Sequence, residues 1–400
     1  MAIEGRGNLN IELIYGPAGV GKTEAVVTRI VDLLARIPSS APTCIAVLAP
    51  THSAVRNIRN RVESKIKNTS TIQFATIYSY FRIDWMNDDV IGPIHYYPYI
   101  FIDEFGLIKK ELFQSILHKL ETSSRNISLI ISGDIVQLSP IYECDRAITF
   151  KKLKKHYERT PSFIVEHDYN SIFSLSRIRR AKHTLLSINH RSNEDVLSII
   201  NRLFYQCDCS FIKSLTTMRI IHLITNENYT FISSKYEHQQ PLYDMIMRQK
   251  SKDKDTLIIR RPSNCAFKEL LIFPGARFVA NESYEKKGIL NGDVLEVVNV
   301  RNEPILRKVH SEDELIVLED EDVLPSFMLS AHKAQGLSID KVIVCLDELF
   351  DPCLLYTACT RAQTKLEFYS RKLDDEKRKE ITQYLNQFYE LMQYYHYVQD

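Results

Sequence analysis

The feature that most constrains this chain is a glycine-rich turn between a strand and a helix near the N-terminus. An apolar, β-branched run predicts a strand over residues 11–15, followed directly by Gly16-Pro17-Ala18-Gly19-Val20-Gly21-Lys22-Thr23. Glycines in such a loop let successive backbone N–H groups turn inward and hold phosphate oxygens. The lysine of this pattern reaches the β- and γ-phosphates, the next hydroxyl binds Mg²⁺, and the helix expected over 22–36 adds its positive N-terminal dipole. The pattern predicts that residues 16–23 bind a nucleoside triphosphate together with Mg²⁺.

Two further polar groups follow apolar strands. A strand expected over 99–102 ends in Asp103 and Glu104, and a strand expected over 127–133 is followed by Gln137. Burying a charged side chain at the end of an apolar strand costs free energy unless the charge is paired or binds a ligand. Beside a phosphate loop, Asp103 is predicted to hold Mg²⁺, Glu104 to polarise the attacking water and Gln137 to contact a γ-phosphate. The alternative is that these side chains simply face solvent.

Strands and helical stretches alternate through the first 140 residues, which predicts an α/β fold with a doubly wound parallel sheet and a site at the carboxyl ends of its strands. At Gly275 the pattern changes to short alternating β runs, with a turn at Asn291-Gly292-Asp293, which predicts a small antiparallel barrel. The predicted division is a first domain over 1–145 with a small insertion at 79–97, a basic connecting segment at 146–183, a second domain over 184–274 and 322–372, an inserted β subdomain at 275–321 and a C-terminal helix over 373–400.

Composition restricts the class of protein. Among 400 residues, 44% are hydrophobic and 25% charged, as in an ordinary globular protein, and a net charge of +1 means that any nucleic-acid site is a local basic surface. Eight scattered cysteines without a CxxC pair indicate reduced thiols. Because the sequence has neither a signal-peptide core nor an apolar run of membrane-spanning length, we expect a soluble intracellular protein of the cytoplasm or nucleus, with no membrane partner.

Two segments leave alternatives open. Residues 79–97 are rich in aromatic side chains interleaved with Arg82 and His95, which suits base stacking and equally suits core packing. The basic stretch within 149–182 is either a nucleic-acid contact or a solvated helix face.

The ordered set of motifs resembles the superfamily 1 helicases, in the branch that contains RecD and the Pif-type enzymes. The matching stretches, from motif I through Ia, II, III, IV and V to VI, are GPAGVGKT, LAPTHSAVRNI, IDEFGLI, SGDIVQLSP, LLSINHRSNEDV, AHKAQGLSIDKV and LYTACTRA. The stretch NGDVLEVV is similar to the entry of the SH3-like insertion of that branch. The resemblance extends from residue 11 to about residue 370.

This resemblance implies two tandem RecA-like P-loop NTPase domains with an inserted SH3-like β-barrel and ATP bound between the domains. It assigns Lys22 and Thr23 to phosphate and magnesium, Asp103 and Glu104 to the metal and to catalysis, and Gln137 to sensing the γ-phosphate. Arg191 and Arg361 are then arginines that reach the γ-phosphate from the second domain. Such a group can accelerate phosphoryl transfer by about 10³ to 10⁵ and makes hydrolysis depend on domain closure.

The resemblance also implies an ATP-dependent DNA helicase that travels 5′-to-3′ on single-stranded DNA and opens forked DNA. The residues that it assigns to the nucleic acid are Pro50, Thr51, His52, Thr76, His332 and Lys333. Residues 79–97 occupy the slot of a strand-separating pin. Residues 1–15 contain no glutamine, although the family usually has one there to recognise adenine.

Two other functions remain open. Viral superfamily 1 RNA helicases share these motifs, and a nucleotide-switched nucleic-acid-binding ATPase would use the same phosphate loop without unwinding. The Ala-His-Lys-Ala-Gln stretch and the inserted barrel argue against the first, and the presence of Glu104 and Arg361 argues against the second.

Overall fold

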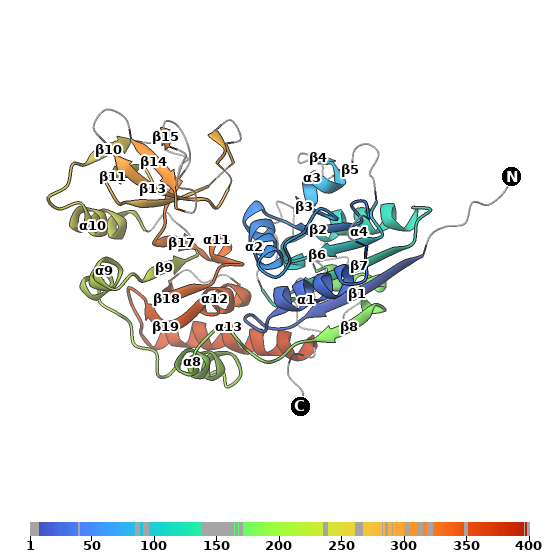
Figure 1. The fold of residues 1–400 in the computed structure, drawn as a ribbon. Coiled ribbons are helices and arrows are strands. Elements are labelled where there is room, and N and C mark those ends of the chain that lie inside the picture. The colour runs from blue at the N-terminus through green and yellow to red at the C-terminus, as the bar shows by residue number, and fades with distance from the viewer. Residues whose placement is uncertain are drawn as a thin grey trace. The chain divides into compact units, whose positions relative to one another are not determined.

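The computed structural model describes residues 8–38, 41–84, 89–90, 96–137, 164, 167, 171–234, 239–260, 267–281, 283–284, 287–289, 291–300, 304–309, 315–317, 323–347, 351–395 and 397. The chain divides into two compact units. Unit 1 comprises residues 1–191 and 387–400, and unit 2 comprises residues 192–386. Figure 1 labels the elements of both units.

A parallel sheet of six described strands, in the order β3-β2-β6-β7-β1-β8, forms the centre of unit 1. The strands are β1 Leu9–Tyr15, β2 Ile45–Ala49, β3 Ile72–Thr76, β6 Tyr99–Ile102, β7 Ile127–Gly133 and β8 Lys182–Leu185. Strand β1, which leads into the glycine-rich loop, lies between β7 and β8 (Figure 1). The parallel sheet predicted for the first 140 residues is confirmed.

The helices of unit 1 bury apolar stripes against this sheet. The described ones are α1 Lys22–Leu34, α2 His52–Glu63, α3 Ile77–Phe81, α4 Lys110–Glu121 and α7 Ser176–Arg179, with the short 3₁₀ turns η1 Phe105–Leu107 and η2 Ile172–Ser174. Val27 and Ile30 of α1 share a buried cluster with Ile58 and Val62 of α2 and with Ile14 of β1. Because these residues are spaced at three or four positions along each helix, they form one apolar face, and both helices cover the same side of the sheet.

The prediction that the second domain begins at residue 184 is wrong, because β8 belongs to the sheet of unit 1. Strand β8 pairs in parallel with β1, with Thr184 opposite Ile14, and the Leu186 N–H donates to the Tyr15 carbonyl at 2.8 Å. Residues up to Arg191 therefore belong to unit 1. A four-residue strand carries too little pattern to specify its partner, because pairing with a distant strand depends on tertiary packing.

The proposed insertion at 79–97 is described in part. Strands β4 Ile83–Asp84 and β5 Asp89–Val90 pair antiparallel. Tyr80 and Phe81 are buried, which for these two aromatic residues favours core packing over base stacking. Residues 85–88 and 91–95 lie outside the described residues, as do most of those in the predicted basic segment 146–183.

Unit 2 contains a four-stranded parallel sheet in the order β17-β9-β18-β19. The strands are β17 Met328–Ser330, β9 Thr230–Ser233, β18 Ile339–Cys345 and β19 Ala362–Tyr369. The described helices of this unit are α8 Glu194–Phe204, α9 Thr217–Asn226, α10 Gln240–Lys250, α11 Ala331–Ala334 and α12 Pro352–Cys359.

The change of pattern at Gly275 marks the start of a five-stranded antiparallel sheet, in the order β15-β14-β13-β12-β16. Its strands are β12 Arg277–Ala280, β13 Val294–Asn299, β14 Ile305–Lys308, β15 Leu315–Val317 and β16 Val323–Pro325. Because β16 ends at Pro325, the sheet extends past the predicted end of the insertion at 321. The preceding strands β10 Leu257–Arg260 and β11 Glu269–Ile272 form a separate antiparallel pair.

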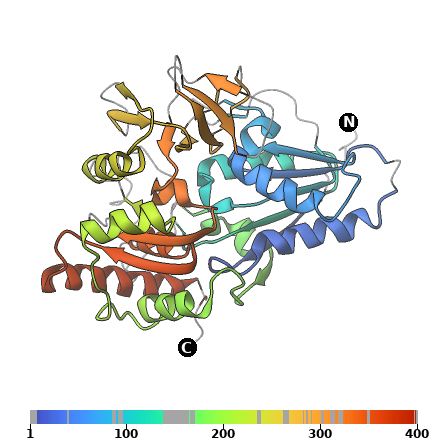
Figure 2. The ribbon, with the colours of Figure 1, turned by 60° about the vertical axis from the view of Figure 1, so that its left-hand side comes forward.

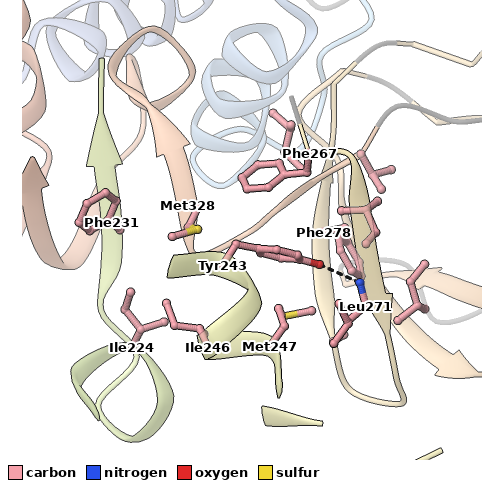
Figure 3. Close-up of a cluster of buried hydrophobic side chains, with 14 of the residues drawn as sticks. Ile224, Phe231, Tyr243, Ile246, Met247, Phe267, Leu271, Phe278 and Met328 are labelled. Atoms are coloured by element: carbon pink, nitrogen blue, oxygen red, sulfur yellow. Dashed lines mark hydrogen bonds between the residues drawn. The ribbon is translucent and has the colours of Figure 1, made fainter. Parts of the chain in front are cut away.

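The parallel and antiparallel parts of unit 2 share one hydrophobic core. Phe231 and Met328 of the parallel sheet and Phe278 of the antiparallel sheet lie in a single buried cluster (Figure 3). Tyr243 of α10 is fully buried there, and its hydroxyl accepts the Leu271 N–H at 3.0 Å (Figure 3). A shared core of this kind fixes the inserted strands to the sheet that carries them.

The chain ends in the 20-residue helix α13 Asp375–Tyr394, which is one uninterrupted element (Figure 2). Its first residues belong to unit 2, and residues from Gln387 onward belong to unit 1. Within the part of the chain that the structure describes, no helix is both long and apolar enough to span a bilayer.

Candidate nucleotide-binding site

The loop that joins β1 to α1 has the backbone shape that phosphate binding requires. Gly19 and Gly21 take φ values of +82° and +80°, which L side chains rarely adopt. Gly21 is also the N-cap of α1 and supplies no side-chain hydrogen bond. The N–H groups in the first turn of this 13-residue helix therefore point toward the loop and can attract an anion.

Lys22 is held over its own loop. Its Nζ donates to the carbonyls of Gly16 at 2.9 Å and Pro17 at 2.7 Å and lies 4.0 Å from Asp134 Oδ2. Burial lowers the pKa of Lys22, and the nearby Asp134 carboxylate opposes this shift most strongly. An anionic ligand such as a triphosphate would compensate the burial of this ammonium in the same way.

The candidate magnesium ligands are in direct contact. The Thr23 hydroxyl donates to Asp103 Oδ2 at 2.7 Å, and the Ser132 hydroxyl donates to Asp103 Oδ1 at 2.5 Å. Asp103, at the end of β6, is only 5% exposed. Mg²⁺ usually binds through one or two protein oxygens together with phosphates and water, so this hydroxyl and carboxylate fit that ion. Among the described residues, no group of three or more His, Cys, Asp or Glu side chains forms a separate metal site.

Glu104 takes a strained backbone conformation. Its φ of +56° is left-handed, which is uncommon outside glycine and recurs at functional sites. The adjoining turn is tightly packed: a Cβ added at Gly133 would lie 2.7 Å from the Phe105 ring, and one at Gly106 would lie 2.9 Å from the Asp134 carbonyl. The turn that follows Glu104 therefore lies directly against the end of β7 and the start of the next loop.

Gln137 is placed by Asp134, a residue that the sequence reasoning did not select. Gln137 Nε2 donates to Asp134 Oδ2 at 3.0 Å, and the two side chains are 5% and 2% exposed. The buried Gln137 Oε1 has no hydrogen-bond partner among the described residues. Buried polar atoms are nearly always paired, so this oxygen is suited to accept from a bound water or ligand.

Arg191 lies on the phosphate loop of unit 1, which corrects the expectation that it approaches from the second domain. The chain that follows β8 runs along the loop: Asn189 Nδ2 donates to the Ala18 carbonyl at 3.0 Å, and the His190 N–H donates to the Gly19 carbonyl at 2.8 Å. A Cβ added at Gly19 would lie 3.0 Å from the Arg191 Cβ. The positive charge of Arg191 also contributes to the lowered pKa of Lys22.

Arg361 belongs to unit 2 and is 1% exposed. Its Nε donates to the Thr357 carbonyl at 2.9 Å, Nη2 to the Thr360 hydroxyl at 3.2 Å and Nη1 to the Leu337 carbonyl at 3.4 Å. These contacts link the end of α12 to the turn that follows α11.

His332 and Lys333 lie in α11, which Ser330 caps by accepting the Lys333 N–H at 3.3 Å. Burial lowers the pKa of His332. Lys333 Nζ donates to the Asn291 side chain at 2.9 Å and to the Asn281 carbonyl at 3.2 Å. Since both asparagines flank strands of the antiparallel sheet, Lys333 connects α11 to that sheet.

The candidate nucleic-acid residues of unit 1 cluster at one edge of its sheet. Ala49 of β2 pairs with Thr76 of β3, so Pro50, Thr51 and Thr76 all lie at neighbouring strand ends. Thr51 and His52 are exposed at the start of α2, whereas Thr76 is 8% exposed, and its hydroxyl accepts the Ser79 N–H at 3.2 Å. The structure therefore brings the four predicted residues of unit 1 together, and Thr76 is the least exposed of them.

The sequence reasoning missed three residues that organise this site: Ser132, Asp134 and Asn189. One signal pointed to two of them, because Ser132 and Asp134 lie at the carboxyl end of β7, beside the strand that enters the phosphate loop. No comparable signal pointed to Asn189, whose position depends on the pairing of β8.

Two family models match separate parts of the chain. A family model described as an AAA domain matches residues 1–143, and one described as a viral superfamily 1 RNA helicase core domain matches residues 268–370. The ATP-dependent DNA helicase Pif1 of Campylobacter jejuni is 23% identical over 316 residues, which cover 68% of this chain and 69% of that protein. The ATP-dependent DNA helicase PIF1 of Xenopus laevis is 22% identical over 341 residues, which cover 74% of this chain and 49% of that protein.

Among solved structures, Bacteroides Pif1 bound to ssDNA aligns with a TM-score of 0.57 at 16% identity, over 94% of this chain and 91% of that chain. This similarity shows the fold. The predicted resemblance to Pif-type superfamily 1 helicases and the α/β fold with two RecA-like domains are therefore confirmed.

Proposed function

We propose that this chain is an ATP-dependent DNA helicase that couples ATP hydrolysis to movement on single-stranded DNA and to duplex unwinding. The observation that carries the proposal is the contact of Thr23 with Asp103, beside the approach of Lys22 to Asp134. These contacts join the glycine-rich loop to the carboxylates that follow β6 and β7, which supports the assignment of this loop to phosphate binding. The similarity to the Pif1 helicases of Campylobacter and Xenopus supports DNA as the track.

Within unit 1, each step of hydrolysis has a candidate residue. The loop from Gly16 to Thr23 holds the β- and γ-phosphates, and Thr23 with Asp103 holds Mg²⁺, which neutralises phosphate charge when bound. Glu104 takes a proton from the water that attacks the γ-phosphorus, while the bond from phosphorus to the β–γ bridging oxygen breaks and ADP leaves. Gln137 and Arg191 contact the γ-phosphate and respond to its loss.

Arg361 is the candidate from unit 2. Its guanidinium is buried, stays protonated in proteins and has the planar geometry that suits phosphate oxygens. Contact of Arg361 with the γ-phosphate would make hydrolysis depend on the arrangement of the two units. Hydrolysis would thereby be coupled to motion of the units.

For the nucleic acid, we assign Pro50, Thr51, His52 and Thr76 in unit 1 and the pair His332 and Lys333 in unit 2. Such contacts go to the sugar-phosphate backbone and carry no sequence information. We assign the antiparallel sheet from β12 to β16 to the SH3-like insertion. The strand-separating pin is assigned to residues 79–97, of which 85–88 and 91–95 lie outside the described residues.

A second candidate is an RNA helicase, which the match of residues 268–370 to a viral RNA helicase core favours. We prefer DNA as the substrate because both Pif1 relatives are described as DNA helicases. Each of the two alignments covers more than two thirds of this chain.

Unwinding of tailed duplexes tests the proposal. With ATP, we expect the full-length protein to open a DNA duplex with a 5′ single-stranded tail and to leave the matching 3′-tailed duplex closed. RNA duplexes of the same sequence should be opened more slowly, and replacing ATP by GTP tests adenine selectivity. ATP consumption without opening of any tailed duplex would contradict the helicase function, and faster opening of RNA would favour the second candidate.

A further inference from the structure

The C-terminal segment contacts the strand that leads into the phosphate loop. Tyr397 follows α13, and its ring is stacked on that of Tyr15, with the ring centroids 5.7 Å apart and the planes at 29°. Tyr15 is the last residue of β1 and directly precedes Gly16. An aromatic side chain from the far end of the chain therefore packs at the base of the nucleotide loop.

The hydroxyl of Tyr397 bridges two groups of the loop that follows β7. It donates to Asp134 Oδ1 at 3.2 Å and accepts the Ile135 N–H at 3.0 Å. A phenol can donate and accept at the same time, so this arrangement uses both capacities. Asp134 is 2% exposed, and a hydrogen bond to a buried carboxylate is worth more than one in water.

The two oxygens of the Asp134 carboxylate have different tasks. Oδ1 accepts from Tyr397 and from the Val136 N–H at 3.1 Å. Oδ2 accepts from Gln137 Nε2 at 3.0 Å and faces Lys22 Nζ at 4.0 Å. Fixing Oδ1 therefore fixes the direction in which Oδ2 points, and with it the position of Gln137.

We propose that Tyr397 is a positioning residue for ATP hydrolysis: it orients Asp134 so that Gln137 and Lys22 stand in the geometry that hydrolysis needs. This inference rests on the proposed function. Tyr397 acts on hydrolysis through its hydrogen bond to Asp134. Tyr397 lies three residues beyond the last residue of α13, a helix that begins in unit 2 and ends in unit 1.

The chain offers a matched control two residues away. Tyr395 is 1% exposed, its hydroxyl lies 3.2 Å from His167 Nδ1, and its ring packs edge-on against Phe173. Tyr395→Phe and Tyr397→Phe each remove one hydroxyl from the same aromatic cluster and keep the ring. The second removes the hydrogen bond from Tyr397 to Asp134.

The test is the ATPase rate of the full-length protein with saturating single-stranded DNA, measured across ATP concentrations. We expect Tyr397→Phe to lower kcat about tenfold while KM for ATP stays within about twofold, because the phosphate loop is intact and the position of Gln137 is not. Tyr395→Phe should match the wild type in both constants. Equal constants for Tyr397→Phe and the wild type, or an equal loss in Tyr395→Phe, would overturn the inference.

A double-mutant cycle on kcat distinguishes a role through Asp134 from a general structural role of Tyr397. If Tyr397 acts through Asp134, the loss in kcat caused by Tyr397→Phe should vanish in an Asp134→Asn background. Additive losses would contradict the proposal. Should Tyr397→Phe fail to fold, a chain that stops after Tyr395 removes the same contact, and wild-type kcat in that chain would overturn it.

The result also separates this inference from the proposed function. A wild-type protein without DNA-stimulated ATPase would contradict the helicase assignment itself. An active wild type with an equally active Tyr397→Phe variant would contradict only the role of Tyr397.

Discussion

His332 and Lys333 are neighbours in α11, yet they would meet a nucleic acid in different charge states. Burial keeps the pKa of His332 below its usual value near 6.5, and the carboxylate of Asp351 opposes this shift only in part. At pH 7.5, His332 is therefore a neutral hydrogen-bonding group. Lys333 is the member of the pair that can displace a counterion from a phosphate.

This difference predicts distinct salt dependences for single-stranded DNA binding. Lys333→Ala should reduce the slope of log affinity against log salt concentration by about 0.7, the value for one phosphate contact on a single strand. His332→Gln should weaken binding and leave the slope unchanged at pH 7.5. Fluorescence anisotropy with a labelled oligonucleotide at several salt concentrations measures both.

Lys213→Ala removes an exposed lysine elsewhere in unit 2 and serves as the control, with the wild-type slope expected. If Lys333→Ala retains the wild-type slope, Lys333 serves only to connect α11 to Asn281 and Asn291, and its assignment to the nucleic acid is wrong.

At this scale, residues with a strict local pattern could be predicted and those defined by a neighbour could not. Lys22, Thr23 and Asp103 follow from the spacing of the loop and from a strand that ends in a carboxylate, and the structure brings Thr23 and Asp103 into contact. Asp134 was not predicted because its role depends on its contacts with Lys22 and Gln137. Lys22 is more than a hundred residues away in the sequence, and the sequence does not show that the neighbouring Gln137 folds back onto Asp134.

At the scale of elements, β8 and the segment after it help to build the phosphate loop. The Leu186 N–H bonds to the Tyr15 carbonyl, and the chain up to Arg191 then runs beside residues 16–19. A Cβ added at Gly16 would lie 2.1 Å from the Leu186 carbonyl oxygen, closer than any real contact. The glycine is thus required both by its φ of +154° and by this neighbouring backbone.

Gly16→Ala should therefore displace the loop from the segment after β8 and weaken binding of a fluorescent ATP analogue by more than about tenfold, because the contact of under 3 Å is with backbone that cannot rotate away. Gly275→Ala is the matched control. Gly275 has a φ of +84° with no described atom within 4 Å of the added Cβ, so it should cost only about 1–2 kcal/mol of left-handed strain.

Unchanged nucleotide affinity in Gly16→Ala would show that the segment from Leu186 to Arg191 does not shape the loop. A loss of affinity in Gly275→Ala would indicate a general effect of destabilisation, which thermal unfolding of both variants would measure.

The sequence did not predict which sheet β8 belongs to. Strands β6 and β7 of unit 1 were predicted with the bounds that the structure shows, because buried parallel strands are continuous in hydrophobicity. Strand β8 has the pattern exposed, exposed, half-buried, exposed, which gives no preference between two sheets. Its place became evident only from its register with β1.

At the scale of the whole molecule, the order of motifs predicted two α/β units and a β insertion. What the order could not give was where one unit ends and the next begins. The antiparallel strands share a core with the parallel sheet of unit 2. Helix α13 starts in unit 2 and ends in unit 1. Both features depend on packing between segments far apart in the sequence.

The central claim is that hydrolysis at the phosphate loop of unit 1 drives this molecule along DNA. The most direct measurement is the ATPase rate with and without single-stranded DNA for the wild type, Lys22→Ala and the control Lys67→Ala, which removes an exposed lysine of the same unit. We expect strong stimulation by DNA in the wild type and the control, and a loss of at least about a hundredfold in Lys22→Ala, because that ammonium stabilises charge on the transferred phosphoryl group. An undiminished DNA-stimulated rate in Lys22→Ala would contradict the account.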